Sequence, residues 1–417
     1  MAKRHLLMLG LLLGGSAFAS ACTDTKIVTI GGDAGAAGDT GTSGAGGEGG
    51  DAPAFEFPPS LNPQGVVVIG PAPETSTHLL VGASDYVAST GEVVSITLGS
   101  GAVGDHSTFE DGDLETTSSA GIGFAIERTK DRVHLLEDGK ISTTFDLKDP
   151  GSDTVPVDQK AYVPLYNQSL IAILDLAEGK VSRRIDLSAF NAPGDSDRSA
   201  EISEGVYDPN SKIAYFVLQR IDLNSYDESF RLPCSKNPGL VIGVDTDTDE
   251  VVDLNGSGAG KAIELKLVNQ RSLSVNSDGS ALYMLADGCY DGDSKISRGV
   301  EVVDLSDGST TVAYEAPGND YLSRMILLGG PDALLESLDD TFATHWNKLE
   351  IGGKLGAEIH DVPQAVSFDG TDLLGVEVTG KVGKVVRYEL STESSTTISP
   401  TSWVGEYSSA SGTALVQ

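Results

Sequence analysis

Cysteines are the residues of this chain whose type and spacing most directly suggest chemistry. There are three of them, Cys22, Cys234 and Cys289. Cys22 lies near the N-terminus, directly after a run of small residues, and the other two lie in the second half of the chain. If Cys22 is modified, Cys234 and Cys289 form an even pair, and in an oxidising compartment we expect them to form a disulfide. The alternative is two separate buried thiols.

Two acidic loops could in principle bind calcium. The first carries aspartates at alternate positions, Asp245, Asp247 and Asp249, and the second carries Asp287, Asp291 and Asp293 with glycines beside Cys289. An EF-hand needs Gly after its third acidic residue and Glu at its twelfth position, where this chain has Glu250 and Gly256. For both loops a solvated acidic turn is the competing interpretation. We therefore expect no cofactor, with calcium as the weaker possibility.

Other catalytic and metal-binding patterns are missing from the sequence. Five histidines follow the first segment, and they are scattered singly as His78, His106, His134, His345 and His360. Zinc and copper sites usually draw on clustered His and Cys ligands. The sequence also has no nucleophile elbow, P-loop or dinucleotide-binding glycine motif. Linear motifs therefore give no support to catalysis, and whether the protein is an enzyme stays open, with binding favoured.

The first 21 residues have the three-part layout of a secretory signal. Lys3 and Arg4 precede an apolar run from Leu6 to Leu13, and the segment ends in small residues up to Ala21. Many residues of this stretch are Gly, Ala or Ser, whereas a permanent membrane span needs roughly 20 strongly apolar residues. We therefore interpret residues 1–21 as a signal peptide.

Small residues followed by a cysteine resemble the bacterial lipobox, in which the cysteine becomes the lipidated N-terminus. The match departs from the pattern at Ala19, where the family usually has Leu. The resemblance implies that Cys22 is lipidated and that its acyl chains anchor the protein to a membrane. Thr23, in place of Asp, favours the outer membrane of a Gram-negative bacterium by resemblance to the enterobacterial sorting rule. In the alternative, an ordinary signal peptidase cuts after Ala21 and leaves a free thiol.

The charge of the chain excludes one class of partner. It has 61 acidic and 28 basic residues, a net charge of −33, and removing residues 1–21 makes this more negative by two. Such a surface repels phosphates, so we expect no nucleic-acid binding. The simplest role of the excess acid is a solvated surface.

Composition divides the mature chain into a linker and one domain. About half of residues 31–51 are Gly, a composition that cannot bury enough apolar surface to fold. Residues 22–64 are thus a flexible linker, and residues 65–417 are the domain. The domain consists of short apolar runs separated by Gly, Asp, Asn and Ser, and it lacks a sustained helical stripe. This pattern predicts an all-β fold; the expected strands include 66–69, 79–81, 213–218, 240–244 and 300–303.

The strands recur in a repeat. The clearest copy runs from Tyr162 to Leu187: a strand, a polar turn, a strand ending in Asp175, a turn with Gly179 and a last strand. Related copies span 240–254 and 280–305, and weaker ones span 132–147 and 384–397. The repeat resembles the YVTN-type repeats of bacterial, WD40-like β-propellers, which implies a ring of four-stranded blades.

Seven expected closing strands indicate seven blades, with six or eight as alternatives. They end near Leu98, Leu147, Leu187, Leu254, Tyr314, Ile359 and Ile398. We expect the segment from Tyr407 to Val416 to pair with the N-terminal strand and close the ring, because an open ring would expose a strand edge. A pair of β-sandwich domains is the alternative fold, but it does not predict the repeat.

The repeat also places the two cysteines. Cys234 falls after the second strand of the fourth blade and Cys289 after the second strand of the fifth, so we expect both on the same face of the ring. We predict a monomeric, non-catalytic binding or scaffolding protein of the cell envelope that recognises a protein or another envelope component through these loops. The alternative is a periplasmic propeller enzyme such as a lactone hydrolase, whose site would need carboxylates and a metal converging in the central channel.

Overall fold

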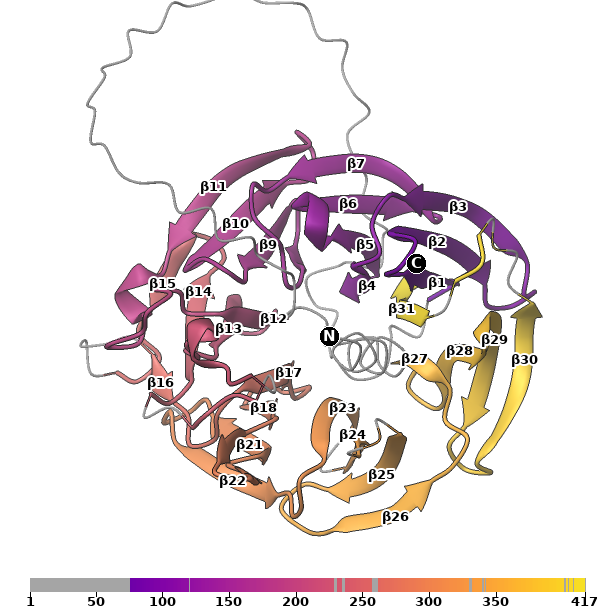
Figure 1. Cartoon of the computed structure of the whole chain (residues 1–417). Helices are drawn as coiled ribbons and strands as arrows, with labels where there is room; N and C mark the ends of the chain where they lie inside the picture. Colours follow the sequence, from indigo (N-terminus) through magenta and orange to yellow (C-terminus); the bar gives the residue numbers. More distant parts are fainter. Residues whose placement is uncertain are drawn as a thin grey trace, which may run out of the picture.

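Seven four-stranded antiparallel sheets form a closed ring in the computed structural model (Figure 1). The structure describes residues 76–416 except 120, 229–230, 235–236, 257–261, 330–331, 340, 342, 401–402, 404 and 408. The protein is therefore a seven-bladed β-propeller, as the repeat predicted. The predicted signal peptide 1–21, the linker 22–64 and the expected strand at 66–69 lie outside the described residues.

The blades are numbered in chain order, and each is listed from its innermost to its outermost strand. Blade 1 contains β31 (Ser409–Val416), β1 (His78–Asp85), β2 (Thr90–Thr97) and β3 (Val103–Phe109); blade 2 contains β4 (Leu114–Ser119), β5 (Ile122–Glu127), β6 (Arg132–Glu137) and β7 (Lys140–Asp146). Blade 3 contains β8 (Val155–Val157), β9 (Lys160–Leu165), β10 (Leu170–Asp175) and β11 (Lys180–Asp186); blade 4 contains β12 (Ile202–Asp208), β13 (Ile213–Leu218), β14 (Leu240–Asp245) and β15 (Glu250–Val252), with β16 (Ile263–Glu264) also paired to β14. Blade 5 contains β17 (Gln270–Val275), β18 (Ala281–Ala286), β21 (Gly299–Asp304) and β22 (Thr310–Glu315); blade 6 contains β23 (Tyr321–Gly329), β24 (Asp332–Leu338), β25 (Thr344–Glu350) and β26 (Leu355–Ile359). Blade 7 contains β27 (Gln364–Phe368), β28 (Leu373–Thr379), β29 (Lys381–Glu389) and β30 (Ser394–Pro400), and a separate hairpin is formed by β19 (Cys289–Asp291) and β20 (Ser294–Ile296).

The described helices are three short 3-10 turns, η2 (Arg128–Lys130), η3 (Ser188–Phe190) and η4 (Leu223–Ser225). None of the helices among the described residues has the length and apolar character needed to cross a membrane.

Burial changes in a regular way from the inside of a blade to its rim. The central strand β13 is buried almost along its whole length, because both of its faces pack against neighbouring blades. The outermost strand β11 has mostly exposed side chains. The core consequently lies in layers between blades, as where Tyr162 of blade 3 packs on Phe216 of blade 4 with ring centroids 6.4 Å apart.

Aspartates that end strands form the turns on one side of the ring. The carboxylate of Asp245 accepts hydrogen bonds from the backbone amides of Asp247 (3.0 Å) and Thr248 (2.8 Å), and Asp175 and Asp304 cap the equivalent turns of blades 3 and 5. Aspartate side chains favour such turns because they mimic a backbone acceptor. This explains why the repeat places Asp at the end of the third strand.

The ring closes through its C-terminal strand. β31 pairs with β1 in antiparallel register, from His78 opposite Val416 to Ser84 opposite Ser409. This confirms the expected closure by the segment from Tyr407 to Val416. One expected closing strand is wrong: Leu98 follows the second chain strand of blade 1, and the outermost strand is β3. β3 is polar and mostly exposed, so it gives no apolar signal in the sequence.

Candidate functional site

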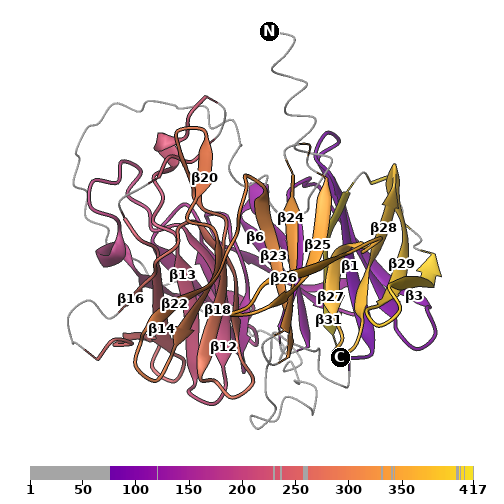
Figure 2. The same cartoon turned by 90° about the horizontal axis from the view of Figure 1, so that it is seen from below.

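Long connections gather on one face of the propeller, which we call the top face. The loops after the second and fourth strands of each blade emerge there, and the short turns between first and second or third and fourth strands lie opposite. The insert 219–239 joins β13 to β14, and the insert 287–298 joins β18 to β21. Figure 2 shows β20, which belongs to the second insert, projecting beyond the ends of the blade strands.

A disulfide joins the two inserts. Cys234 in blade 4 and Cys289 in blade 5 are bonded, with alpha carbons 4.8 Å apart, within the range that unstrained disulfides span. The structure thus contains the disulfide expected from the cysteine count, on equivalent loops of neighbouring blades. We call the described residues of 219–239 together with residues 287–298 the platform.

Backbone contacts make the platform continuous. The amide of Cys234 donates to the carbonyl of Tyr290 (3.2 Å), and the amide of Tyr290 donates to the carbonyl of Leu232 (2.8 Å). Arg231 adds an ion pair to Asp293 at 3.1 Å, and its guanidinium lies 5.5 Å from the centre of the Tyr290 ring. Among the described residues, paired backbone, the Arg231–Asp293 ion pair and the disulfide therefore hold the two inserts together.

A buried lysine fixes the platform to the blades beneath it. The Lys295 side chain is 2% exposed; its ammonium lies 2.7 Å from the carboxylate of Asp287 and 3.4 Å from the centre of the Tyr321 ring in blade 6. Burial lowers the pKa of Lys295 to about 8, and Asp287 opposes this shift. Asp287 also accepts a hydrogen bond from the amide of Leu322 (3.1 Å), so one carboxylate connects the platform to blade 6.

The two predicted calcium loops use their carboxylates differently. Asp249 accepts hydrogen bonds from Lys160 (2.9 Å) and Tyr162 (2.5 Å), and Asp247 pairs with Lys212 at 2.9 Å. Near Cys289, Asp287 pairs with Lys295, whereas the side chain of Asp293 is fully exposed. Neither set of aspartates converges on one point within the described part of the chain.

Acidic side chains on the innermost strands connect adjacent blades. Asp153, which precedes β8, accepts a hydrogen bond from the amide of Gly205 in blade 4 (3.0 Å), and Glu204 accepts one from the amide of Leu273 in blade 5 (2.9 Å). Thr117 and Thr154 form a similar hydroxyl contact between blades 2 and 3 (2.7 Å). These groups satisfy the free edges of inner strands, a structural use that does not require a channel metal.

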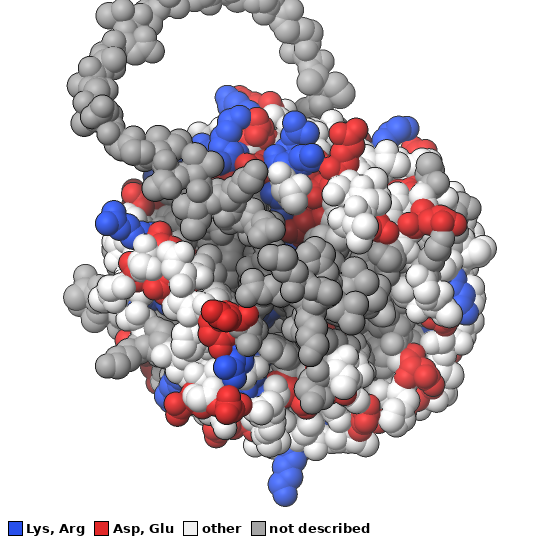
Figure 3. Space-filling model, in the orientation of Figure 1, with Lys and Arg blue, Asp and Glu red and all other residues white. Residues whose placement is uncertain are grey.

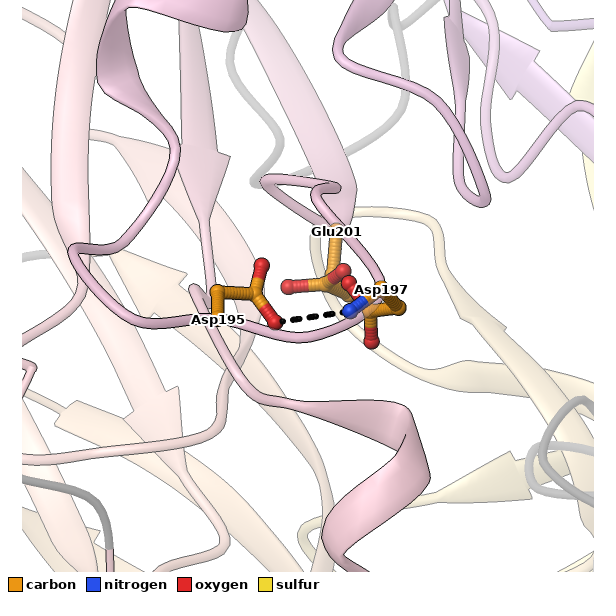
Figure 4. A group of neighbouring side chains, drawn as sticks. All are labelled: Asp195, Asp197 and Glu201. Carbon is orange, nitrogen blue, oxygen red and sulfur yellow. Dashed lines mark hydrogen bonds between the residues drawn. The ribbon is translucent and has the colours of Figure 1, made fainter.

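One group of carboxylates in the described residues does converge. Asp195, Asp197 and Glu201, in the loop between β11 and β12, each offer an oxygen within 4.8 Å of the others (Figure 4). The loop lies on the top face, between blades 3 and 4. All three residues come from one loop, so this is not the channel arrangement expected of a propeller hydrolase. The sequence carries one signal of this group, three acidic residues within seven positions of a polar loop, but no prediction above included it.

Acidic and basic side chains both lie around the ring on the face of the propeller drawn in Figure 3. Figure 3 shows acidic side chains along much of the rim, with basic side chains gathered at its upper edge. Many of the described basic residues are paired with acids, as Lys160 and Arg183 are with Asp249. This distribution agrees with the net charge of −33.

Comparisons with known proteins identify the architecture. No family model matches the chain, and no curated protein matches it. Several solved structures do match the chain. The periplasmic gluconolactonase PpgL of Pseudomonas aeruginosa shares 12% identity over 82% of this chain and 99% of its own, with a TM-score of 0.51. The β-propeller domain of Myceliophteria thermophila Cps50 (Swd1) shares 12% over 77% and 97%, also with a TM-score of 0.51.

A third structure, a protein of unknown function from Desulfotomaculum acetoxidans, shares 10% identity over 81% of this chain and 98% of its own, with a TM-score of 0.51. At such identities the similarity shows the fold alone, and one fold serves many functions. The chain shares its fold with these structures, and the similarity carries no function over to it.

Proposed function

We propose that this protein is a non-catalytic binding or scaffolding lipoprotein of the cell envelope, which recognises a protein or another envelope component through the platform. One observation carries the proposal: long inserts from two neighbouring blades are joined into a single surface by the Cys234–Cys289 disulfide. A surface that is ordered before binding loses less conformational entropy when it binds. The opposite face has short turns and offers no comparable feature among the described residues.

The proposed anchor is the lipid on Cys22. An acylated N-terminus followed by the linker 22–64 would hold the propeller near the outer membrane, in the oxidising compartment that the disulfide requires. If the anchor is correct, Cys22→Ser moves the protein from the membrane fraction to the soluble fraction. A variant that stays as membrane-bound as the wild type would refute it.

A lactone hydrolase is the alternative that the shared fold of PpgL leaves open. Such an enzyme would need carboxylates that converge from several blades, whereas the converging group of the described residues comes from one loop. Binding through the platform is therefore the proposal that the geometry supports better.

The test compares the two faces directly. A photo-crosslinking residue replaces exposed Glu228 on the platform, and a second variant places it at exposed Ser391, in the turn between β29 and β30 on the opposite face. In cells that make the full chain, we expect a discrete adduct from position 228 and none from position 391. Adducts from 391 alone, or none from either position, would contradict the proposal.

A further inference from the structure

The loop between β11 and β12 holds a buried carboxyl group, Glu201, that forms no ion pair with the described basic side chains. Glu201 is 0% exposed, and neither of its side-chain oxygens makes a hydrogen bond of normal geometry. An unpaired buried charge costs several kcal/mol, so buried carboxylates are normally paired or bound to metals. Glu201 lies immediately before β12, so the backbone of the blade fixes its position.

Two more carboxylates face Glu201. Asp195 has one oxygen on the amide of Asp197 (3.3 Å), and its other oxygen is buried without a partner. Asp197 accepts hydrogen bonds from the amides of Ser199 (2.9 Å) and Leu223 (2.6 Å). None of the three makes an ion pair with the described lysines and arginines. The Arg220 guanidinium donates to the carbonyl of Pro238 (3.1 Å), and the charges of Glu264 and Asp195 act on it electrostatically.

Two of the three carboxyl groups have raised pKa values. Burial, together with the charges of Asp197 and Asp195, raises the pKa of Glu201 to about 9, and contacts with Ser199 and the Ile221 backbone oppose this shift only in part. Burial and the charge of Asp197 raise the pKa of Asp195 to about 6. These directions are those expected of anions that lack a compensating cation.

We infer that Asp195, Asp197 and Glu201 form a binding site for a hard divalent cation, Ca²⁺ in particular. Ca²⁺ takes six to eight oxygen ligands at 2.3–2.6 Å with flexible geometry, so oxygens within 4.8 Å of one another can share one ion. Mg²⁺ demands near-octahedral geometry and keeps several waters, which suits a three-carboxylate loop less well. The oxygen-only donor set also disfavours Zn²⁺.

The site has a mechanical consequence for the top face. Asp197 accepts from the amide of Leu223, and Ser196 donates to Asp222 (2.8 Å), so the loop is attached to η4 at the start of the insert 219–239. A bound divalent cation would offset most of the negative charge of the loop and stiffen the base of the platform. The inference does not depend on what the platform binds.

The test uses the full chain, purified in detergent and freed of metal with a chelator. Titration with CaCl2, followed by calorimetry and by thermal unfolding, should show one ion per chain and a Tm that rises with Ca²⁺ concentration. Glu201→Gln keeps the shape and removes the charge, so it should reduce Ca²⁺ affinity by at least about ten-fold and abolish the rise in Tm. In chelator its Tm should equal or exceed that of the wild type, because glutamine removes the cost of a buried carboxyl group that no cation compensates.

Controls make each outcome decisive. Asp247→Asn removes an exposed aspartate on the opposite side of the ring and should leave the Ca²⁺ response unchanged, and Asp195→Asn replaces Glu201→Gln if the latter does not fold. A wild-type protein that shows neither heat nor a Tm shift at millimolar Ca²⁺, or a Glu201→Gln variant that responds normally, overturns the inference. An equal or stronger response to MgCl2 overturns the assignment to Ca²⁺.

Discussion

At the scale of single residues, the platform depends on Lys295. Its ammonium is enclosed by Asp287 and the Tyr321 ring, and its side chain is 2% exposed. Replacing Lys295 with Met leaves Asp287 as a buried carboxylate without its nearest cation. Removing one partner of a buried ion pair typically costs about 3–5 kcal/mol.

We therefore expect Lys295→Met to lower the free energy of unfolding by about that amount in urea titration. The double variant Asp287→Asn, Lys295→Met removes both charges of the pair and should recover much of the loss, although Arg271, 3.8 Å from Asp287, then loses that carboxylate. Equal losses in the single and double variants would show that packing of the lysine stem, and not the ion pair, stabilises this region.

A second residue-scale effect concerns pH. Burial and the charge of Glu204 raise the pKa of Asp153 to about 7, while the Gly205 and Thr154 amides and Arg128 act in the opposite direction. The folded state then binds a proton more tightly than the unfolded chain does, so the contribution of Asp153 to stability is fully present at low pH and is lost as pH rises through about 7.

We expect the Tm of the wild type to fall between pH 5 and pH 8, and Asp153→Asn to reduce that slope. Asparagine keeps the acceptor for the Gly205 amide but cannot ionise. Asp332→Asn, at an exposed position of β24, is the matched control and should follow the wild type. If the Tm of Asp153→Asn falls with pH as steeply as that of the wild type, Asp153 does not cause the fall.

At the scale of elements, the disulfide should hold the inserts and not the blades. Cys234 and Cys289 are 55 residues apart in sequence, and closing such a loop is worth roughly 4 kcal/mol in the chain-entropy model. The double change to serine should lower stability by a few kcal/mol and speed proteolysis within 219–239 and 287–298.

Far-UV circular dichroism should meanwhile keep its β-rich form in this variant, because the interblade cores do not involve the disulfide. Two titratable thiols in non-reduced wild-type protein would contradict the bond itself. Loss of the β signal in the serine variant would instead mean that the inserts are needed for the blades to fold.

Some strands and turns could be predicted from the sequence, and others could not. The apolar run 213–218 and the turn aspartate Asp245 follow local rules of periodicity and turn chemistry, and both lie where the repeat predicted. β3 was missed because an outermost strand needs little apolar surface. The group around Glu201 depends on how the loop folds back on η4, and no local pattern determines such contacts.

At the scale of the whole molecule, ring closure is the decisive contact. β31 provides the innermost strand of blade 1, and its Leu415 and Val416 are buried in layers shared with neighbouring blades. Deleting residues 407–417 should expose the edge of β1 and remove these layers, so we expect a large drop in Tm and aggregation.

Deletion of residues 1–64, in contrast to deletion of 407–417, should have little effect on stability. The linker is too poor in apolar residues to contribute to a core, so the shortened chain should remain monomeric, β-rich and nearly as stable as the full mature chain. Aggregation of this shortened chain, or full stability after loss of 407–417, would contradict the description of a self-contained ring closed by β31.

If the top face binds through the platform, the full chain in its native envelope should show a footprint there. Hydroxyl-radical labelling read by mass spectrometry compares each peptide in intact envelopes with the purified, detergent-solubilised protein. We predict protection of peptides from 219–239 and 287–298, and no change in the opposite turns 305–309 and 390–394. Protection of those turns instead, or equal labelling of both faces, would contradict a binding role for the platform.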